Sequence, residues 1–137
     1  MIRCIYSLIC EKFVVSAIDH QLSAINFLPF FAIEKNEIRS KRLNKPLTIV
    51  LLLEKDIDES AKLRYEITKK DIADVLETDD LDVNENPGIH ISAYTLSKML
   101  HRGPGEYSIN VMYQVEGTDV WQPLTQSPFF LAKEKKQ

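Results

Sequence analysis

The chain has 137 residues and a mass of 15.8 kDa, enough for one domain that buries its own core without disulfides or metals. Its formal net charge of −3 argues against a general attraction to nucleic acid or to an anionic membrane surface. Two cysteines are too few for a disulfide framework, and no apolar run approaches the ~18–20 residues that cross a membrane.

The N-terminal segment MIRCIYSLICEKFVV has three interpretations: a secretory signal, a pair of thiols for a metal or disulfide, or a β-strand. Glu11 and Lys12 end the apolar stretch too early for a signal peptide. In an extended strand Cys4 and Cys10 would lie about 20 Å apart, well beyond the ~7 Å between bridged Cα atoms. We therefore expect a first strand whose thiols are small buried side chains in a reducing compartment, the cytoplasm. One face of this strand would carry Cys4, Tyr6, Leu8 and Cys10.

An apolar run, INFLPFFAI, overlaps the end of the predicted second strand QLSAINFLP. Pro29 interrupts this run, so its large side chains cannot all point to one face of a strand. We expect part of the run to close one end of the core and part to be exposed as an interface. The aromatic side chains proposed to bind a partner are Phe27, Phe30, Phe31, Trp121 and Phe129.

The stretch IRSKRLNKP is basic and is predicted to be a solvated loop between two strands. Its cations are Arg39, Lys41, Arg42 and Lys45. The alternative is a patch for phosphate or for an acidic partner. Glutamates interleave with these cations and no aromatic residues alternate with them, so a nucleic-acid surface is not expected.

Alternation of apolar and polar residues predicts several strands after this loop. KLRYEIT and GEYSINVMYQVEG each have one apolar face, while PLTIVLLLEK is apolar on both faces, as in a covered central strand. In GIHISAYTLSKML we expect Ile89, Ile91 and Ala93 to share one face and His90 to point away from them.

The segment TKKDIADVLETDDLDVNENPG interrupts the strand rhythm, and we predict one short helix followed by an acidic loop. The helical spacing and its capping box involve Ile72, Val75 and Leu76 with Thr68 and Asp71. Residues 80–84 match the first ligand positions of a calcium loop, but Glu85 and Ile91 stand where that loop needs glycine and a bidentate glutamate. A solvated loop is therefore expected. The alternative is a small metal-dependent hydrolase that uses residues 71–85 with His90 or His101.

The C-terminal segment VWQPLTQSPFFLAK contains Pro123 and Pro128, so we expect it at a sheet edge or broken into two pieces. Together, the segments predict a mainly β, single-domain, immunoglobulin-like sandwich of about seven strands with one short helix in a crossover. The domain would span residues 1–132, and residues 133–137 would form a flexible tail.

The segments LICEKFVV, QLSAINFLPFF and PGEYSINVMY, taken in this order, resemble an uncharacterised bacterial family described only as a domain of unknown function. Its members typically open with a cysteine-containing strand and carry a G-x-Y strand near the C-terminus. The resemblance implies a compact β-sandwich from a bacterium or a phage, working in the cytoplasm. It implies no activity, cofactor or catalytic residue.

No motif of a known catalytic site occurs in the sequence, so we expect a non-enzymatic accessory or structural module without a cofactor. Such a module would bind a protein partner, or a second copy of itself, through an edge strand or an apolar loop surface. We expect it to bind neither nucleic acid nor membrane.

Overall fold

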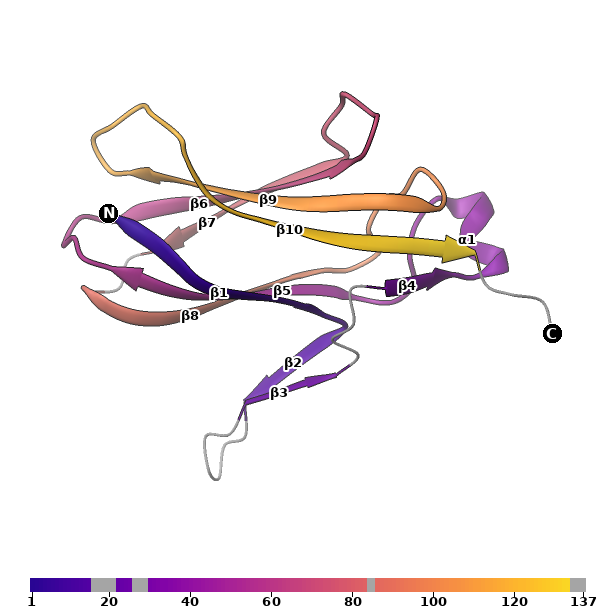
Figure 1. Cartoon of the computed structure of the whole chain (residues 1–137), viewed down its shortest axis with the longest axis horizontal. Coiled ribbons are helices and arrows are strands. Elements are labelled where there is room, and N and C mark those ends of the chain that lie inside the picture. The colour runs from indigo at the N-terminus through magenta and orange to yellow at the C-terminus, as the bar shows by residue number, and fades with distance from the viewer. Residues whose placement is uncertain (16–21, 26–29, 84–85, 134–137) are drawn as a thin grey trace.

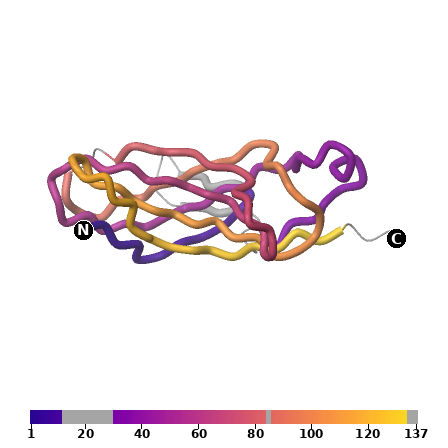
Figure 2. The backbone as a smooth tube through the Cα atoms, turned by 90° about the horizontal axis from the view of Figure 1, so that it is seen from above, coloured from indigo at the N-terminus to yellow at the C-terminus, as the bar shows by residue number. Residues whose placement is uncertain are grey.

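A computed structural model describes residues 1–15, 22–25, 30–83 and 86–133 of the chain. Two β-sheets stack face to face, with a short helix at one end and a hairpin that projects from one sheet (Figure 1). Seen from above, the molecule is elongated along its strands (Figure 2). The prediction of a mainly β sandwich is confirmed. No helix in the described ranges is long and apolar enough to cross a membrane.

The first sheet has three antiparallel strands in the order β1–β5–β8. Their bounds are Ile2–Cys10, Leu47–Lys55 and Gly88–Leu96. The second sheet has five strands in the order β4–β10–β9–β6–β7, in which β4 and β10 run parallel and the other pairs antiparallel. Their bounds, in that order, are Phe30–Ile33, Gln122–Lys133, Gly105–Val115, Ala61–Lys69 and Glu77–Val83. A separate hairpin pairs β2 with β3, whose bounds are Lys12–Val15 and Leu22–Ile25.

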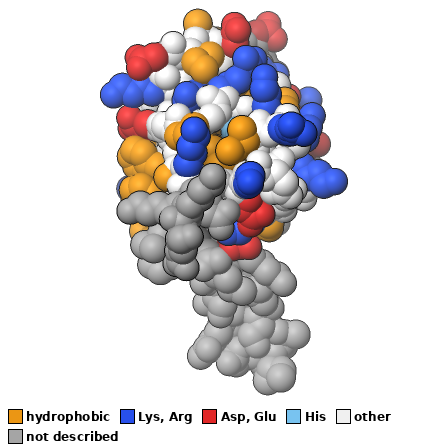
Figure 3. Space-filling model, turned by 90° about the vertical axis from the view of Figure 1, so that its right-hand side faces the viewer, with side chains coloured by type: hydrophobic (Ala, Val, Ile, Leu, Met, Phe, Trp, Pro, Cys, Tyr) orange, Lys and Arg blue, Asp and Glu red, His pale blue; other side chains and the backbone are white. Residues whose placement is uncertain are grey.

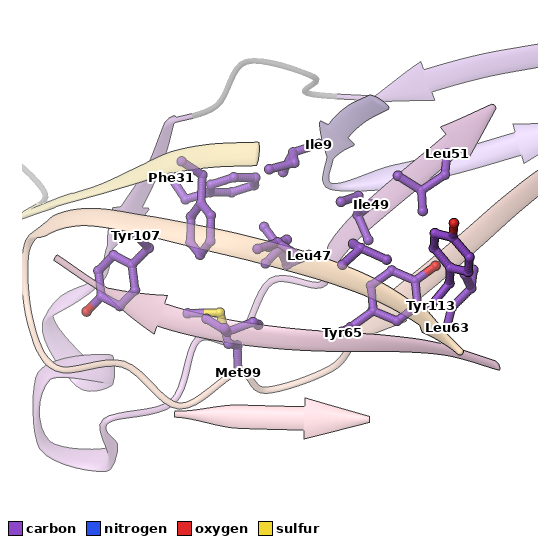
Figure 4. Packing of buried hydrophobic residues seen from close by; sticks show 14 of the residues in the cluster. Ile9, Phe31, Leu47, Ile49, Leu51, Leu63, Tyr65, Met99, Tyr107 and Tyr113 are labelled. Atoms are coloured by element: carbon purple, nitrogen blue, oxygen red, sulfur yellow. The ribbon is translucent and has the colours of Figure 1, made fainter. Parts of the chain in front are cut away.

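The core lies between the two sheets and is built by alternate residues of β5, β6 and β9. Leu47, Ile49, Tyr65 and Tyr107 point into this space (Figure 4) and are each 1% exposed. The predicted alternation of KLRYEIT and GEYSINVMYQVEG is therefore confirmed. The prediction that β5 is a central strand is also confirmed, because it lies between β1 and β8.

The helix does not lie where the sequence predicted it. Helix α1 spans Lys35–Ser40, and its second half overlaps the start of the stretch IRSKRLNKP that was predicted to be a loop. Residues 70–76 form a turn in which Asp71 has φ 69, and the acidic residues that follow belong to strand β7. Three apolar residues at helical spacing cover a single turn, which is too short to be stable without tertiary support. Here Leu76 instead packs against the core, and its N–H donates to the carbonyl of Ile67 at 2.8 Å.

The predicted first strand is confirmed, but a β-bulge at Ile5 changes its faces. Cys4 pairs with Leu53 and Tyr6 with Leu52, which leaves one residue unmatched between the two pairs. Cys4 therefore contacts the core, whereas Cys10 lies on the opposite face, where it is buried. The prediction that both thiols share a face is wrong. Neither thiol forms a disulfide, and burial raises the pKa of Cys4.

Strand β10 is not broken, and the sheet order places it between β4 and β9. However, β4 pairs only with residues 130–133 of β10. Pro123 and Pro128 therefore occupy the part of β10 that has a ladder with β9 alone, where a missing N–H costs no hydrogen bond on the open side. Lys133, assigned to the predicted tail, is the last residue of β10, and residues 134–137 lie outside the described ranges.

The described chain contains ten strands rather than about seven. Eight of them form the two sheets, and the remaining two form the β2–β3 hairpin.

Candidate functional site

The five aromatic residues proposed to bind a partner do not form one surface. Phe31 and Phe129 are 8% and 0% exposed, so their side chains belong to the core and not to an exposed surface. Phe31 meets Phe129 edge to face at 6.3 Å between ring centroids, and Phe129 stacks on Tyr107 at 5.3 Å. Alternation along β4 directs Phe31 into the core and leaves Phe30 62% exposed. Phe27 lies outside the described residues.

Phe30 and Trp121 reach the surface near opposite ends of β10. Phe30 pairs with Phe130 and stacks on its ring at 5.1 Å. Trp121 precedes β10 and is half-buried, with the guanidinium of Arg64 4.1 Å from its ring centroid. The extended chain from Trp121 to Phe130 covers about 30 Å, so these two aromatic side chains cannot line one pocket.

The acidic segment contributes an edge strand rather than a loop. Asp80 accepts a hydrogen bond from Nε of Arg64 at 2.8 Å, and this bond lowers the pKa of the Asp80 carboxyl. Tyr94 donates its hydroxyl proton to Asp79 at 2.6 Å. Burial, and then this contact with a carboxylate, raise the pKa of Tyr94. Within the described ranges, no three His, Cys, Asp or Glu side chains gather as a metal site would require.

The two histidines of the alternative hydrolase have structural contacts. His101 is 3% exposed; its Nε2 donates to the carbonyl of Glu37 at 3.0 Å, and its Nδ1 accepts from the N–H of Gly103 at 3.0 Å. Both ring nitrogens of His101 are thus occupied by the backbone. His90 is half-buried, with Nε2 2.5 Å from the carbonyl oxygen of Asn86.

An apolar surface covers the side of the three-stranded sheet that faces away from the core. On β8, Ser92 and Tyr94 face inward, because Ser92 lies 3.3 Å from the hydroxyl of Tyr65 and Tyr94 stacks on that ring. The alternate residues therefore face outward, and Ile89 and Ile91 are 56% and 49% exposed. We call this surface the outer face, formed by Tyr6, Leu8, Leu52, Ile89, Ile91 and Ala93; Val50 lies on the same side of the sheet but is buried.

The cross-strand register joins these side chains into one surface. Leu52 pairs with Tyr6 on one side and with Ile91 on the other, so the three form a row across the sheet. Tyr6 is 60% exposed. The β2–β3 hairpin extends from the same side of the sheet and flanks the outer face (Figure 1). The sequence pattern predicted that Ile89 and Ile91 share one face and that His90 lies on the other, and this is confirmed. The pattern did not indicate that the isoleucine face is the exposed one.

The four edges of the two sheets differ in how they are protected from pairing with another strand. Strand β7 is acidic, β4 is only four residues long, and β1 contains the bulge. In addition, β1 lies against β10, where the hydroxyls of Ser7 and Ser127 are 3.0 Å apart. Strand β8 has nine residues, no charge, no proline and a continuous register with β5. It is therefore the least protected of these four edges.

The sequence matches no protein-family model and no curated protein. Among solved structures, the C-terminal domain of wzt is similar to this chain, with a TM-score of 0.52 and 13% sequence identity. The match covers 99% of this chain and 75% of that one. At this identity the similarity concerns the fold, and it supports the assignment of the chain as a β-sandwich.

Proposed function

We propose that the protein is a non-enzymatic interaction module that binds an extended segment of a protein partner along β8 and over the outer face. The observation that carries this proposal is the contrast between β8 and the three protected edges. An uncharged, unbulged strand of nine residues offers a row of backbone N–H and C=O groups that can accept another strand.

Backbone hydrogen bonds would supply much of the affinity, and alternate side chains the specificity. Ile89, Ile91 and Ala93 lie on one side of β8 at a spacing of two residues. A partner strand with apolar side chains at the same spacing would continue the apolar outer face across the new edge. Asp80 and His101, which the hydrolase alternative would use, are engaged in contacts within the fold. These contacts favour the non-enzymatic proposal over the hydrolase.

Site-specific photo-crosslinking in the native host tests the proposal. A photoreactive amino acid replaces Ile91 in one variant and Ile5 in a matched control. Ile5 is also an exposed isoleucine of the three-stranded sheet, at 44% against 49%, but it lies on the β1 edge. We expect position 91 to give one discrete protein adduct and position 5 to give none.

The substitution Ile91→Lys should abolish the complex, whereas Ile5→Lys should leave it intact, because a charge on the docking strand opposes pairing. The mass of the adduct distinguishes a second copy of this chain from another protein. No adduct at position 91, or equal adducts at both positions, would refute the proposed edge.

A further inference from the structure

One end of the molecule concentrates positive charge although the chain is acidic overall. Lys and Arg side chains gather around hydrophobic side chains at the end that carries α1 (Figure 3). We call this surface the basic end, formed by Lys35, Arg39, Lys41, Arg42, Lys98, Arg102 and Lys133. All seven are exposed. The net charge of −3 therefore conceals a strong separation of charge.

The backbone brings these cations together from separate parts of the chain. Lys41 ends α1 in a left-handed conformation with φ 55, and its carbonyl accepts the N–H of His101 at 2.9 Å. The N–H of Leu43 donates to the carbonyl of Met99 at 2.9 Å. These bonds hold the chain after α1 against the chain before β9, so that Lys41 and Arg102 line the same hollow.

The nearby carboxylates leave most cations of the basic end without an ion pair in the described structure. Glu37 is 1% exposed, and its carboxylate accepts the backbone N–H groups of Glu34 and Asn44. Glu77 accepts the N–H of Leu100 at 3.1 Å and lies 4.0 Å from Arg42. In the described structure, no carboxylate forms an ion pair with Lys41, Arg102 or Lys133.

The centre of the basic end is an apolar hollow of about 280 Å³. Ile33, Ile38 and Pro104 supply its apolar wall, and Ile38 is 48% exposed. The cations of Lys41, Arg102 and Lys133 stand around it. An apolar pocket of this kind can hold one anchor side chain of a protein partner. The charged groups around it can pair with charges that flank the anchor and so fix the register of the partner.

We propose that this hollow binds an acidic segment of a protein partner that carries one apolar anchor residue. Its carboxylates face Lys41, Arg102 and Lys133, and the anchor enters the hollow between Ile33 and Ile38. Among the described residues that line the hollow there is no Phe, Tyr or Trp to stack on a base, and the ring of His101, which does line it, is 3% exposed; this favours a peptide over a nucleic acid. This inference uses a surface separate from β8 and does not rest on the proposed strand pairing.

Fluorescence anisotropy with a labelled peptide tests the inference on the full chain. The probe is a nonapeptide with a central leucine and four glutamates on each side. A second peptide, with serine in place of the leucine, tests the apolar anchor. A single-stranded 12-mer oligonucleotide tests the nucleic-acid alternative. We expect the leucine peptide to bind in 50 mM salt, and to bind at least about tenfold more weakly after Arg102→Gln. Binding to the wild-type protein should also weaken about tenfold when the central leucine is replaced by serine. It should weaken to a similar extent when the salt concentration is raised to 300 mM.

Lys62→Gln is the matched control, because Lys62 is an exposed lysine on β6 away from this hollow and its loss changes the net charge equally. The inference is overturned if Lys62→Gln weakens binding as much as Arg102→Gln does. It is also overturned if the serine peptide binds as well as the leucine peptide, if the oligonucleotide binds more tightly than either, or if no peptide binds.

Discussion

The buried carboxylate of Glu37 gives the sharpest test of how the α1 end is held together. The side chain accepts the N–H of Glu34 at 2.7 Å and also the N–H of Asn44, so it joins both flanks of the helix. Its own backbone carbonyl accepts from Nε2 of His101. The perturbation is Glu37→Ala, which removes both carboxylate bonds and leaves the backbone bond to His101 in place.

The loss of folding stability in Glu37→Ala follows from the two hydrogen bonds that its carboxylate makes. A bond between a charged acceptor and a backbone N–H contributes roughly 1.5–3 kcal/mol. Both bonds of Glu37 are partly buried rather than fully buried, so we take the lower end of that range for each. Glu37→Ala should therefore lower the free energy of unfolding by about 3 kcal/mol, with a small further loss from the vacated volume. Glu37→Gln keeps one acceptor oxygen and should cost about half as much.

Urea denaturation followed by circular dichroism measures both values. Glu59→Ala is the matched control, because Glu59 is exposed in the turn between β5 and β6, and its loss should change stability by less than about 0.5 kcal/mol. Amide hydrogen exchange at Asn44 should also accelerate in Glu37→Ala. A loss below about 1 kcal/mol, or one equal to that of Glu59→Ala, would refute the assigned role of this carboxylate.

Two further predictions concern the core and the acidic edge. Phe129→Ala should lower the free energy of unfolding by about 3–5 kcal/mol, because Phe129 is fully buried between the rings of Phe31 and Tyr107. Phe30→Ala should lower it by only about 1 kcal/mol, because Phe30 is exposed. Equal losses for the two variants in urea denaturation would contradict the assigned burial. Asp80→Asn should be less stable than the wild type at pH 7, and this difference should shrink as the pH falls below about 4. The hydrogen bond with Arg64 lowers the pKa of Asp80 in the folded state, so the Asp80 carboxylate stabilises the fold at pH values above its unfolded pKa of about 3.9. This stabilisation is lost as the pH falls through the folded pKa. A stability difference that persists in acid would contradict the assigned ion pair.

The sequence was most informative where strands are buried on a single face. In β9, the alternation from Tyr107 to Tyr113 matches burial residue by residue, because the other face is polar. In β8 the alternation was correct but did not indicate which face meets the core, since both sets of side chains are largely apolar or neutral. Period two shows which residues share a face; which face meets the core depends on register and neighbours. Tyr94 and Ser92 face inward because Tyr65 of β6 contacts both.

Two other errors have local causes that composition does not reveal. The bulge at Ile5 inserts one residue into β1 and reverses the faces beyond it, and the consecutive apolar residues at 4–6 and 8–10 give no alternation that would reveal it. Helix α1 is six residues long and depends on the bonds of Glu37 to Glu34 and Asn44. Because Asn44 lies beyond the helix, this support comes from the fold around the segment and not from helix propensity.

The acidic residues of β7, which resemble the start of a calcium loop, protect the β7 edge from pairing with another strand, whereas the β8 edge has no such charges. In β7, Asp80 stands opposite Arg64 and Asp82 opposite Lys62, so opposite charges stabilise this strand on β6. On its free side the same carboxylates would repel a further strand and would be costly to desolvate. Strand β8 follows β7 in the chain but joins the other sheet, and it carries no charge. If charge protects the first edge, strand addition is directed to the second, and an interaction at β8 should be lost when a lysine is placed there at position 91.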